Sequence, residues 1–501
     1  MAIAPVKAAQ NRSGLRSGTL GFPAVLGQSI ALISPTMTAV LIIPLAFSNA
    51  GNGTWLAYLF GTVMLLFVVL GLNQFARRSA APGAMYTYTA RGLGPATGVL
   101  SGWTLLWCYL MIGTAGLTGF AIFFQQFLSA LGFTATVPPD IFFIISAVTC
   151  WYIAYKDIRI STLVTLTLEG ISVFLILSLA AVVLFSRGIH VDTAQVTLKG
   201  ISLHGMSLAV VATIFSLVGF ESATALGSEA KNPLRNVPRA VIWSLILTGL
   251  FMVIMGYVEV FGTRHYGTSL AGLSAPLNTL ASIYNVSFFR APIALGAMIS
   301  FFSLSLSCLN AGARIIFPMG EHLVFPRQLG RVHPENGTPH VAITVYALIM
   351  VAIPTVLELV TNPLTTFGDV GTLAAFGFLL AYFLITIAAP AYLRRRGELR
   401  PRNLVIAVIA CLCLLVPTIG SFYPRPPFPI DVFPYIFVAY MAVGGSWLFY
   451  VSRRRRGILA EIEADLDQTL AADEQGPVPV TANEVADEPA AAGPEARLSP
   501  G

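Results

Sequence analysis

The chain contains twelve apolar runs, each about long enough to cross a lipid bilayer as an α-helix. A soluble protein of 501 residues could not bury so much apolar surface, since 56% of the residues are hydrophobic, only 10% are charged and the mean hydropathy is +0.77. The sequence therefore predicts an all-α polytopic membrane protein with twelve transmembrane helices. The runs cover approximately residues 22–47, 54–76, 97–131, 140–156, 160–186, 205–228, 239–262, 291–318, 341–360, 364–393, 403–421 and 432–452.

Positive charge is distributed unevenly between the predicted loops. With the N-terminus inside, five of the 29 Lys and Arg residues fall outside and the other 24 fall inside. This asymmetry satisfies the positive-inside rule and predicts a multi-pass protein of the cell (plasma or inner) membrane with both termini in the cytoplasm. It also explains the net charge of +6 as membrane topology, so we expect lipid and no nucleic acid as a partner. The five outer residues are Arg187, Lys199, Arg264, Arg290 and Arg425.

The sequence contains no recognisable catalytic or metal-binding motif. Its five cysteines lie in apolar runs without CxxC or Cys/His spacing. Its six histidines lie in loops or near the ends of runs, and no HExxH motif, nucleophile elbow or phosphate loop occurs. We therefore expect no enzyme, no metal and no cofactor. An ion channel would need a lined pore or filter, which the breaks described next do not provide.

The apolar run that starts near residue 205 is interrupted in its middle by Ser216, Gly219 and Glu221. A charged side chain at bilayer depth costs from roughly 2.5 kcal/mol to more than 10 kcal/mol, so Glu221 is expected to face a cavity or a partner. Gly219 allows the backbone to leave helical geometry, which is tolerated only away from lipid. The first apolar run has a comparable interruption at Ser34-Pro35-Thr36-Met37-Thr38. A simple proline kink is the alternative interpretation of this second feature.

The residues around the later break resemble one family closely. Phe215, Ser216, Gly219, Phe220, Glu221 and Ser222, followed by Glu229-Ala230-Lys231-Asn232-Pro233, Arg235 and Pro238-Arg239-Ala240, are similar to the sixth helix and following loop of amino acid–polyamine–organocation permeases. The resemblance implies a five-plus-five inverted repeat (LeuT-like) with discontinuous helices 1 and 6. Motif similarity extends from about residue 22 to 393.

This resemblance divides the chain into four parts. Residues 1–20 form a cytoplasmic N-terminal tail without the features of a cleaved signal peptide. Residues 21–393 form the ten-helix transport core, and residues 394–456 form helices 11 and 12. Residues 457–501 are rich in Ala, Glu, Asp and Pro and are predicted to be a disordered acidic cytoplasmic tail.

Two facing helix breaks suit a substrate with both an ammonium and a carboxylate. Half-helix N-termini offer N–H groups to the carboxylate, and half-helix C-termini offer carbonyls to the ammonium. We place the carboxylate on the backbone of Ser34 to Met37, which includes Pro35 and Thr36, and the amino group on carbonyls of the first span and of Phe215 to Val218. The family usually has a glycine-rich segment where this chain has Ser-Pro-Thr. This departure weakens any transfer of side-chain specificity.

Phe215 resembles the aromatic residue that closes over the substrate in the family, with plain packing as the alternative. Trp107 and Tyr109 in the third run are weaker candidates for such a gate. Glu229 to Arg239, together with Asn310 and Arg314, are expected to form the inner gate and its ion pairs.

Glu169 is the second acid predicted within the membrane. It lies ten residues beyond Arg159, hence roughly 15 Å into the helix. Proton-coupled relatives carry a titratable group on helix 5 near the cation position between helices 1 and 8, and Glu169 is our candidate for proton coupling. The alternatives are a packing role for Glu169, and sodium held by the hydroxyl-rich eighth span. The hydroxyls of that span are Ser300, Ser303, Ser305 and Ser307.

The sequence thus predicts a secondary active transporter of amino acids, working by alternating access as a proton symporter. The alternative is an amine or polyamine importer, or an amino acid/amine antiporter, in which Glu221 binds an ammonium. Glu221 is a site residue in either case, as pH sensor, substrate contact or selector of cationic side chains. The preferred substrate side chain and the oligomeric state do not follow from the sequence.

Overall fold

The computed structural model describes residues 18–81, 83, 85–133, 135–156, 158–186, 191–273, 275–423, 428–455 and 457–465. Apart from one isolated parallel bridge between Leu20 and Ala230, the regular structure of these residues is helical. This agrees with the predicted all-α membrane protein, because a helix satisfies its own backbone hydrogen bonds in lipid.

The helices are named here in chain order. The α-helices are α1 (Phe22–Ile33), α2 (Pro35–Met37), α3 (Ile43–Ala50), α4 (Thr54–Ala76), α5 (Met85–Leu93), α6 (Pro95–Ala130), α7 (Pro139–Lys156), α8 (Ile158–Phe185), α9 (Thr193–Val196), α10 (Leu203–Leu217), α11 (Pro233–His265), α12 (Pro276–Ile283), α13 (Arg290–Glu321), α14 (His340–Leu357), α15 (Pro363–Arg395), α16 (Pro401–Gly420) and α17 (Phe433–Arg454). Shorter 3₁₀ or π segments are η1 (Thr38–Ile42), η2 (Gly51–Gly53), η3 (Phe220–Glu229), η4 (Ser287–Phe289), η5 (Arg327–Gly330) and η6 (Ile430–Val432).

Within the described residues, ten helical stretches are long and apolar enough to cross a membrane. The first, Phe22–Ala76, is 55 residues long and contains two of the predicted runs. The predicted run at 140–156 forms α7, which is not among the ten. The count of twelve spans and the inverted repeat therefore stay predictions.

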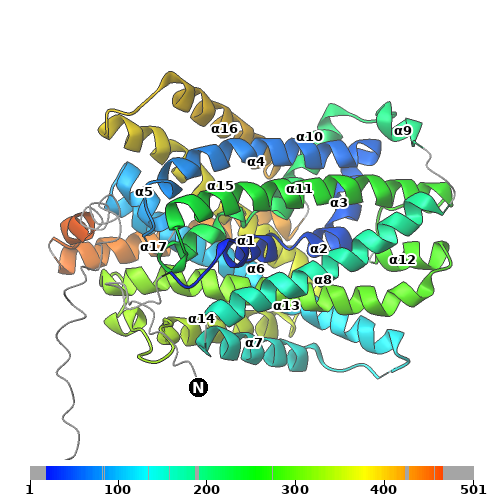
Figure 1. Cartoon of the computed structure of the whole chain (residues 1–501), viewed down its shortest axis with the longest axis horizontal. Helices are drawn as coiled ribbons and strands as arrows, with labels where there is room; N and C mark the ends of the chain where they lie inside the picture. Colours follow the sequence, from blue (N-terminus) through cyan, green and yellow to red (C-terminus); the bar gives the residue numbers. More distant parts are fainter. Residues whose placement is uncertain are drawn as a thin grey trace, which may run out of the picture.

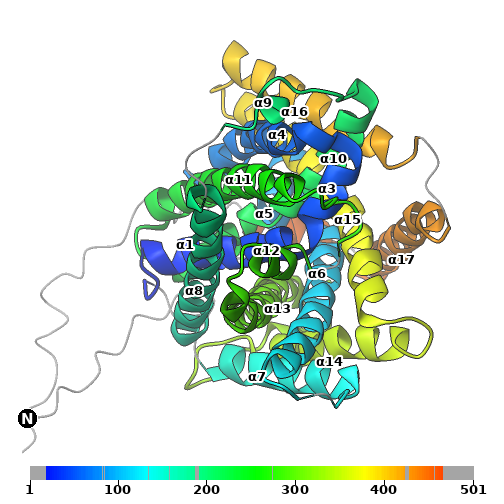
Figure 2. The same ribbon diagram turned by 90° about the vertical axis from the view of Figure 1, so that its right-hand side faces the viewer.

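The centre of the molecule is built around α6 and α13. Viewed end-on, these two helices lie between α16, α17 and α7, which mark the edges (Figure 2). Close approach requires small residues on α6, because a Cβ on Gly116 would overlap Ser305 and one on Gly119 would overlap Phe301. Membrane helices pack closely through such small residues. We call this closely packed pair the scaffold, and it lies beside the segments that carry the helix breaks.

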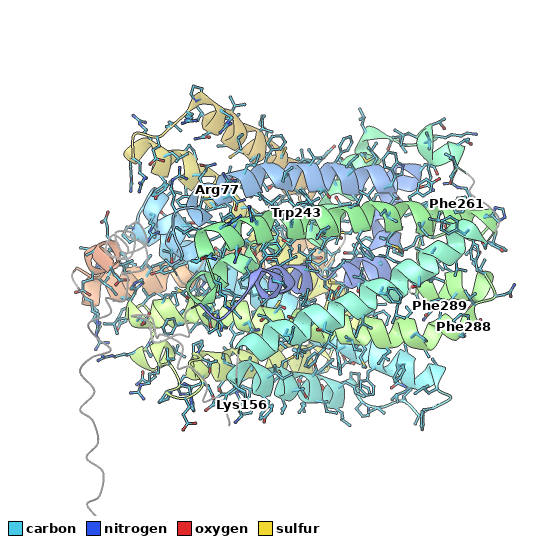
Figure 3. All side chains as sticks on the ribbon, viewed as in Figure 1. Arg77, Lys156, Trp243, Phe261, Phe288 and Phe289 are labelled. Carbon is cyan, nitrogen blue, oxygen red and sulfur yellow. The ribbon has the colours of Figure 1, made fainter. Side chains whose placement is uncertain are left out.

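One end of the helix bundle carries many of the arginines, and we call it the basic end. Arg77 after α4 and Lys156 at the end of α7 lie towards this end, whereas Phe261, Phe288 and Phe289 lie towards the other (Figure 3). An ion pair of 2.8 Å between Arg78 and Glu398 joins the α4 and α15 ends there. Most long helices run between the two ends (Figure 1).

The first residues of the predicted disordered tail are helical. Residues 458–465 are helical, and both Ile458 and Ile462 are buried. Asp465 of this short helix contacts His322, which follows α13, at 3.0 Å. The prediction of disorder is wrong for residues 458–465, because apolar side chains at 458 and 462, one helical turn apart, dock the segment on the basic end. Residues 466–501 and 1–17 lie outside the described residues.

Candidate substrate and coupling site

The first helix break lies at Ser34 and Pro35. Ser34 closes α1 in the left-handed region (φ 49°, ψ 72°), and its N–H donates to Ile30 O at 2.9 Å. Pro35 then begins α2. The N–H of a first helical residue has no acceptor within its helix, so proline loses no hydrogen bond at this position. The chain continues through the π segment η1. A left-handed residue ends the helix, so the feature is a true interruption and more than a proline kink.

The second break lies at Val218 and Gly219. Val218 is extended, Gly219 has φ 104°, and the chain then enters the 3₁₀ segment η3. A Cβ at Gly219 would overlap the side chain of Leu32 in α1. Glycine is therefore required here both by the backbone angle and by the contact with the first broken helix.

The two breaks lie against each other, although 184 positions separate Ser34 from Val218. The Ser29 hydroxyl of α1 donates to Phe220 O at 2.7 Å and accepts from the Ala223 N–H at 3.0 Å. These bonds join the last turns of α1 to the first turn of η3. Gly219 itself lies against Leu32 near the end of α1. The predicted substrate residues Ser34, Pro35, Thr36, Met37, Ser216, Val218 and Gly219 lie at the two breaks, and all are buried.

Glu169 reaches the first break from α8, which crosses the α1–α2 region (Figure 1). Its Oε1 accepts from the Thr36 N–H at 3.4 Å and from the Thr36 hydroxyl at 3.1 Å. Its Oε2 accepts a short hydrogen bond from the Ser300 hydroxyl of α13. Ser300 also lies 3.0 Å from the Ser34 hydroxyl. The buried carboxyl group of Glu169 thus links α8 both to the first break and to α13.

The other hydroxyls proposed for sodium do not all share this position. Ser305 donates to Gly113 O of α6 at 3.2 Å, which is a packing contact between scaffold helices. Ser303 and Ser307 are buried in α13. Ser172 of α8 joins the group instead, with its hydroxyl 2.7 Å from that of Thr36. The sequence pattern gave no reason to select Ser172.

Glu221 is fully buried and holds the second break to α6 and α15. The Tyr109 hydroxyl of α6 donates to Oε1 at 2.9 Å, and the Tyr382 hydroxyl of α15 donates to Oε2 at 2.7 Å. The Tyr382 oxygen in turn accepts from the Gly219 N–H at 3.2 Å. Both carboxyl oxygens are therefore engaged by phenols.

The aromatic candidates fall in different places. Phe215 is half-buried, and the tip of its ring would lie 2.6 Å from a Cβ added at Gly371 of α15. Tyr109 belongs to the site through Glu221. Trp107 points elsewhere: it donates to Leu373 O at 2.8 Å and its ring lies 4.5 Å from that of Tyr440 in α17. Phe220, which we did not select, stacks on Tyr382 with ring centroids 5.0 Å apart.

A buried ion pair joins the segments at the basic end of the site. Arg314 of α13 donates to both carboxylate oxygens of Glu229, from Nε at 2.6 Å and from Nη2 at 2.9 Å. Its Nη1 donates to Asn310 O at 3.2 Å. The amides of Thr19 and Leu20 donate to Glu229 O, which ties the segment before α1 to the same place. The structure thus pairs residues that the sequence grouped as an inner gate.

The model of the family described as "Amino acid permease" matches residues 26–445, which includes both breaks, Glu169 and the buried ion pair. The chain belongs to the amino acid permease family. The family assignment agrees with the resemblance found at residues 215–240, and it covers helices beyond that motif.

Relatives of this permease are transporters that are named for different substrates. The branched-chain amino acid permease BcaP of Bacillus subtilis (strain 168) is 24% identical over 430 residues, covering 79% of this chain and 85% of the relative. The methylthioribose transporter of the same organism is 23% identical and covers 87% of this chain and 92% of the relative. The low-affinity putrescine importer PlaP of Escherichia coli (strain K12) is 28% identical, covering 64% of this chain and 71% of the relative.

One buried acid in this permease was missed by our sequence analysis. Glu259 of α11 is fully buried, and neither of its carboxyl oxygens has a hydrogen-bond partner among the described residues. It lies near the face of α11 that packs on α4, since a Cβ at Gly256, three residues earlier, would lie 3.3 Å from the Tyr58 ring. The signal was present in the sequence as a single acid in the apolar run 239–262.

Proposed function

We propose that this permease is a secondary active transporter that carries amino acids by alternating access in symport with protons. The observation that carries the proposal is the contact between the two helix breaks, with Glu169 hydrogen-bonded to the first. Discontinuous helices that meet inside a membrane protein create exposed backbone groups suited to a small charged substrate. The relatives support a small amino acid or amine as the cargo.

The substrate carboxylate would bind the N-terminal turn that follows the first break. Thr36 is the key residue there, because its N–H and hydroxyl both point to a carboxyl group, that of Glu169. The ammonium would bind carbonyls at the end of α10, between Phe215 and Val218. Phe215 would close over the substrate, since its half-buried ring lies against α15 on the side of the break.

Coupling would follow from competition for Thr36. An ionised Glu169 holds the N–H and hydroxyl that a substrate carboxylate needs, and protonation removes its negative charge. A proton on Glu169 would thus favour substrate binding, and substrate binding would favour the proton. This reciprocity is the thermodynamic requirement for symport.

Alternating access would use the buried Glu229–Arg314 pair as the inner gate. The pair joins η3, which follows the second break, to the scaffold helix α13. Opening would separate these segments and release substrate at the basic end. That end would face the cytoplasm of a cell (plasma or inner) membrane, with both termini inside, as the distribution of Lys and Arg favours.

An amine or polyamine importer, or an amino acid/amine antiporter, is the second candidate. The 28% identity to a putrescine importer favours it. Putrescine is a diamine without a carboxylate, so such a substrate would not need the N–H groups at the first break. In such a protein Glu221 would exchange its tyrosine bonds for an ammonium during transport.

Uptake competition distinguishes the two candidates. Purified protein in liposomes would be assayed for accumulation of labelled leucine, lysine, ornithine and putrescine under an inward proton gradient, with unlabelled leucine, leucinamide and isovalerate as competitors. Accumulation of an amino acid that is inhibited by leucine but by neither leucinamide, which lacks the carboxylate, nor isovalerate, which lacks the ammonium, supports recognition of both head groups. Accumulation of putrescine that is insensitive to every carboxylate would instead support the amine importer.

A further inference from the structure

A cavity of about 830 Å³ opens at the basic end between the end of α13, the loop that follows it and the last turns of α17. It lies apart from the helix breaks and is used by none of the proposed transport steps. Three arginines line it, Arg327, Arg454 and Arg455, together with one acid, Glu321. All three arginines are exposed.

One wall of the cavity is formed by two aromatic residues of α17, Trp447 and Tyr450, and hydrogen bonds hold this aromatic wall in place. Trp447 donates from Nε1 to Val324 O at 2.9 Å, which fixes α17 to the loop after α13. Arg454 donates to the Tyr450 hydroxyl at 2.8 Å, so this guanidinium is directed over the aromatic wall. Phe325 also lines the cavity and packs against Trp103, with ring centroids 5.8 Å apart.

An exposed apolar stripe on α17 leads away from the cavity along the helix. Val443, Trp447 and Tyr450 are all exposed and follow the spacing i, i+4, i+7, which places them on one face, with Arg454 next in the row. The order along this face is therefore aliphatic, aromatic and then cationic. A phospholipid has the matching order of acyl chain, glycerol region and phosphate.

We propose that this cavity binds the headgroup of an anionic phospholipid, with the arginines on its phosphate and an acyl chain along Val443 and Trp447. Arginine suits phosphate because its planar group donates two parallel hydrogen bonds. A free anion would use only the arginines, whereas the continuous stripe on α17 favours a ligand that also lies in the bilayer. The inference does not depend on which substrate is carried.

A second cavity at the basic end provides a matched control. It measures about 340 Å³ and is also lined by three arginines, Arg77, Arg235 and Arg239, yet no aromatic residue lines it. The same number of positive charges is thus present without the aromatic wall. Replacement of these arginines measures what charge alone contributes.

The test is binding of phosphatidylglycerol to the full chain in detergent, followed by native mass spectrometry. We expect the wild type to retain phosphatidylglycerol in preference to phosphatidylcholine, and R327Q/R454Q/R455Q to lose roughly tenfold or more of that occupancy. R77Q/R235Q/R239Q should retain it, and Val443→Ser should weaken it while leaving all arginines in place. Size-exclusion profiles and thermal unfolding of each variant report whether it is folded, and Arg455→Gln alone serves if the triple variant is not.

Four results would overturn the proposal. These are equal occupancy by the two lipids, equal loss in both triple variants, displacement of phosphatidylglycerol by millimolar inorganic phosphate, and lipid binding that appears only after residues 466–501 are removed. The third would identify a free-anion site. The fourth would identify the acidic end of this chain as the occupant.

Discussion

Glu169 and Thr36 are joined by two hydrogen bonds, from the Thr36 N–H at 3.4 Å and from its hydroxyl at 3.1 Å to the same carboxyl oxygen. The two residues are 133 positions apart, and the contact places an acid at the N-terminal turn after the first helix break. Groups that hold this carboxyl group are the ones that a substrate carboxylate would use. The contact is therefore the physical basis of the coupling proposed above.

Replacement of Gly219 by alanine should destabilise the protein. Alanine at φ 104° is strained, and its Cβ would overlap Leu32, so we expect a loss of about 2–4 kcal/mol in unfolding free energy and loss of uptake. Thermal unfolding in detergent measures the first effect. Gly170→Ala in α8 is the control, because a Cβ there meets nothing within 4 Å. Equal unfolding temperatures for the two variants would contradict the close contact between the breaks.

Removal of one member of the buried ion pair should cost more than removal of both. Arg314→Gln leaves the buried Glu229 carboxylate without its bidentate partner, and a loss of about 3–5 kcal/mol is expected. The double variant Glu229→Gln/Arg314→Gln leaves no uncompensated charge and should lose less. A double-mutant cycle by thermal unfolding measures the coupling. Additive effects of the two single changes would show that the pair is not formed.

The helix at residues 458–465 should undock at low pH. The hydrogen bond from His322 lowers the pKa of Asp465 below its ordinary range, so the ionised carboxylate is the form that is bound. The contact contributes its stability above the ordinary pKa of an aspartate and loses it as the pH falls through the lowered value. Labelling of Ile462→Cys, which replaces a buried side chain, by 2,2′-dipyridyl disulfide, a reagent whose protonated form still reacts with thiols in acid, should accelerate in that range relative to the same reaction with a free thiol.

Asp465→Asn provides the control for this titration. The asparagine variant should label rapidly at neutral pH and change little on acidification. Labelling of the parent Ile462→Cys protein that stays slow throughout the titration would show that Asp465 does not hold the helix.

Glu259→Met should raise stability. A buried carboxyl group without a hydrogen-bond partner costs about 1–3 kcal/mol, and methionine has a similar length without the polar atoms. Thermal unfolding should therefore shift upwards by several degrees relative to wild type. A downward shift would indicate that Glu259 has a stabilising partner. Uptake measured on the same sample shows whether transport needs the acid.

The local interruptions of the helices were predictable, whereas their partners were not. Pro35 and Gly219 disturb a helix by their own covalent structure, so each break could be located from the sequence. Glu169 could be placed at membrane depth by counting residues from Arg159. These inferences rest on spacing within one segment.

The contacts between segments depend on how the helices rotate and pack. Tyr109 and Tyr382 donate to the same carboxyl group from α6 and α15, and no spacing within either helix indicates that they meet. Trp107, two residues from Tyr109, points to a different neighbour for the same reason. The helix at residues 458–465 was missed because the segment was assigned to the disordered tail from its acidic composition. Ile458 and Ile462, one helical turn apart, were the opposing signal.

The most direct test of the account is accumulation of labelled substrate in liposomes under an inward proton gradient, for wild type and Glu169→Gln, beside substrate exchange without a gradient. The conservative change keeps the shape of the side chain and removes its ability to carry a proton. We predict that the variant loses gradient-driven accumulation and keeps exchange, while Glu461→Gln, an exposed control, behaves as wild type. Proton-driven accumulation that is unchanged in Glu169→Gln, or accumulation that requires sodium, would contradict the proposed role of Glu169.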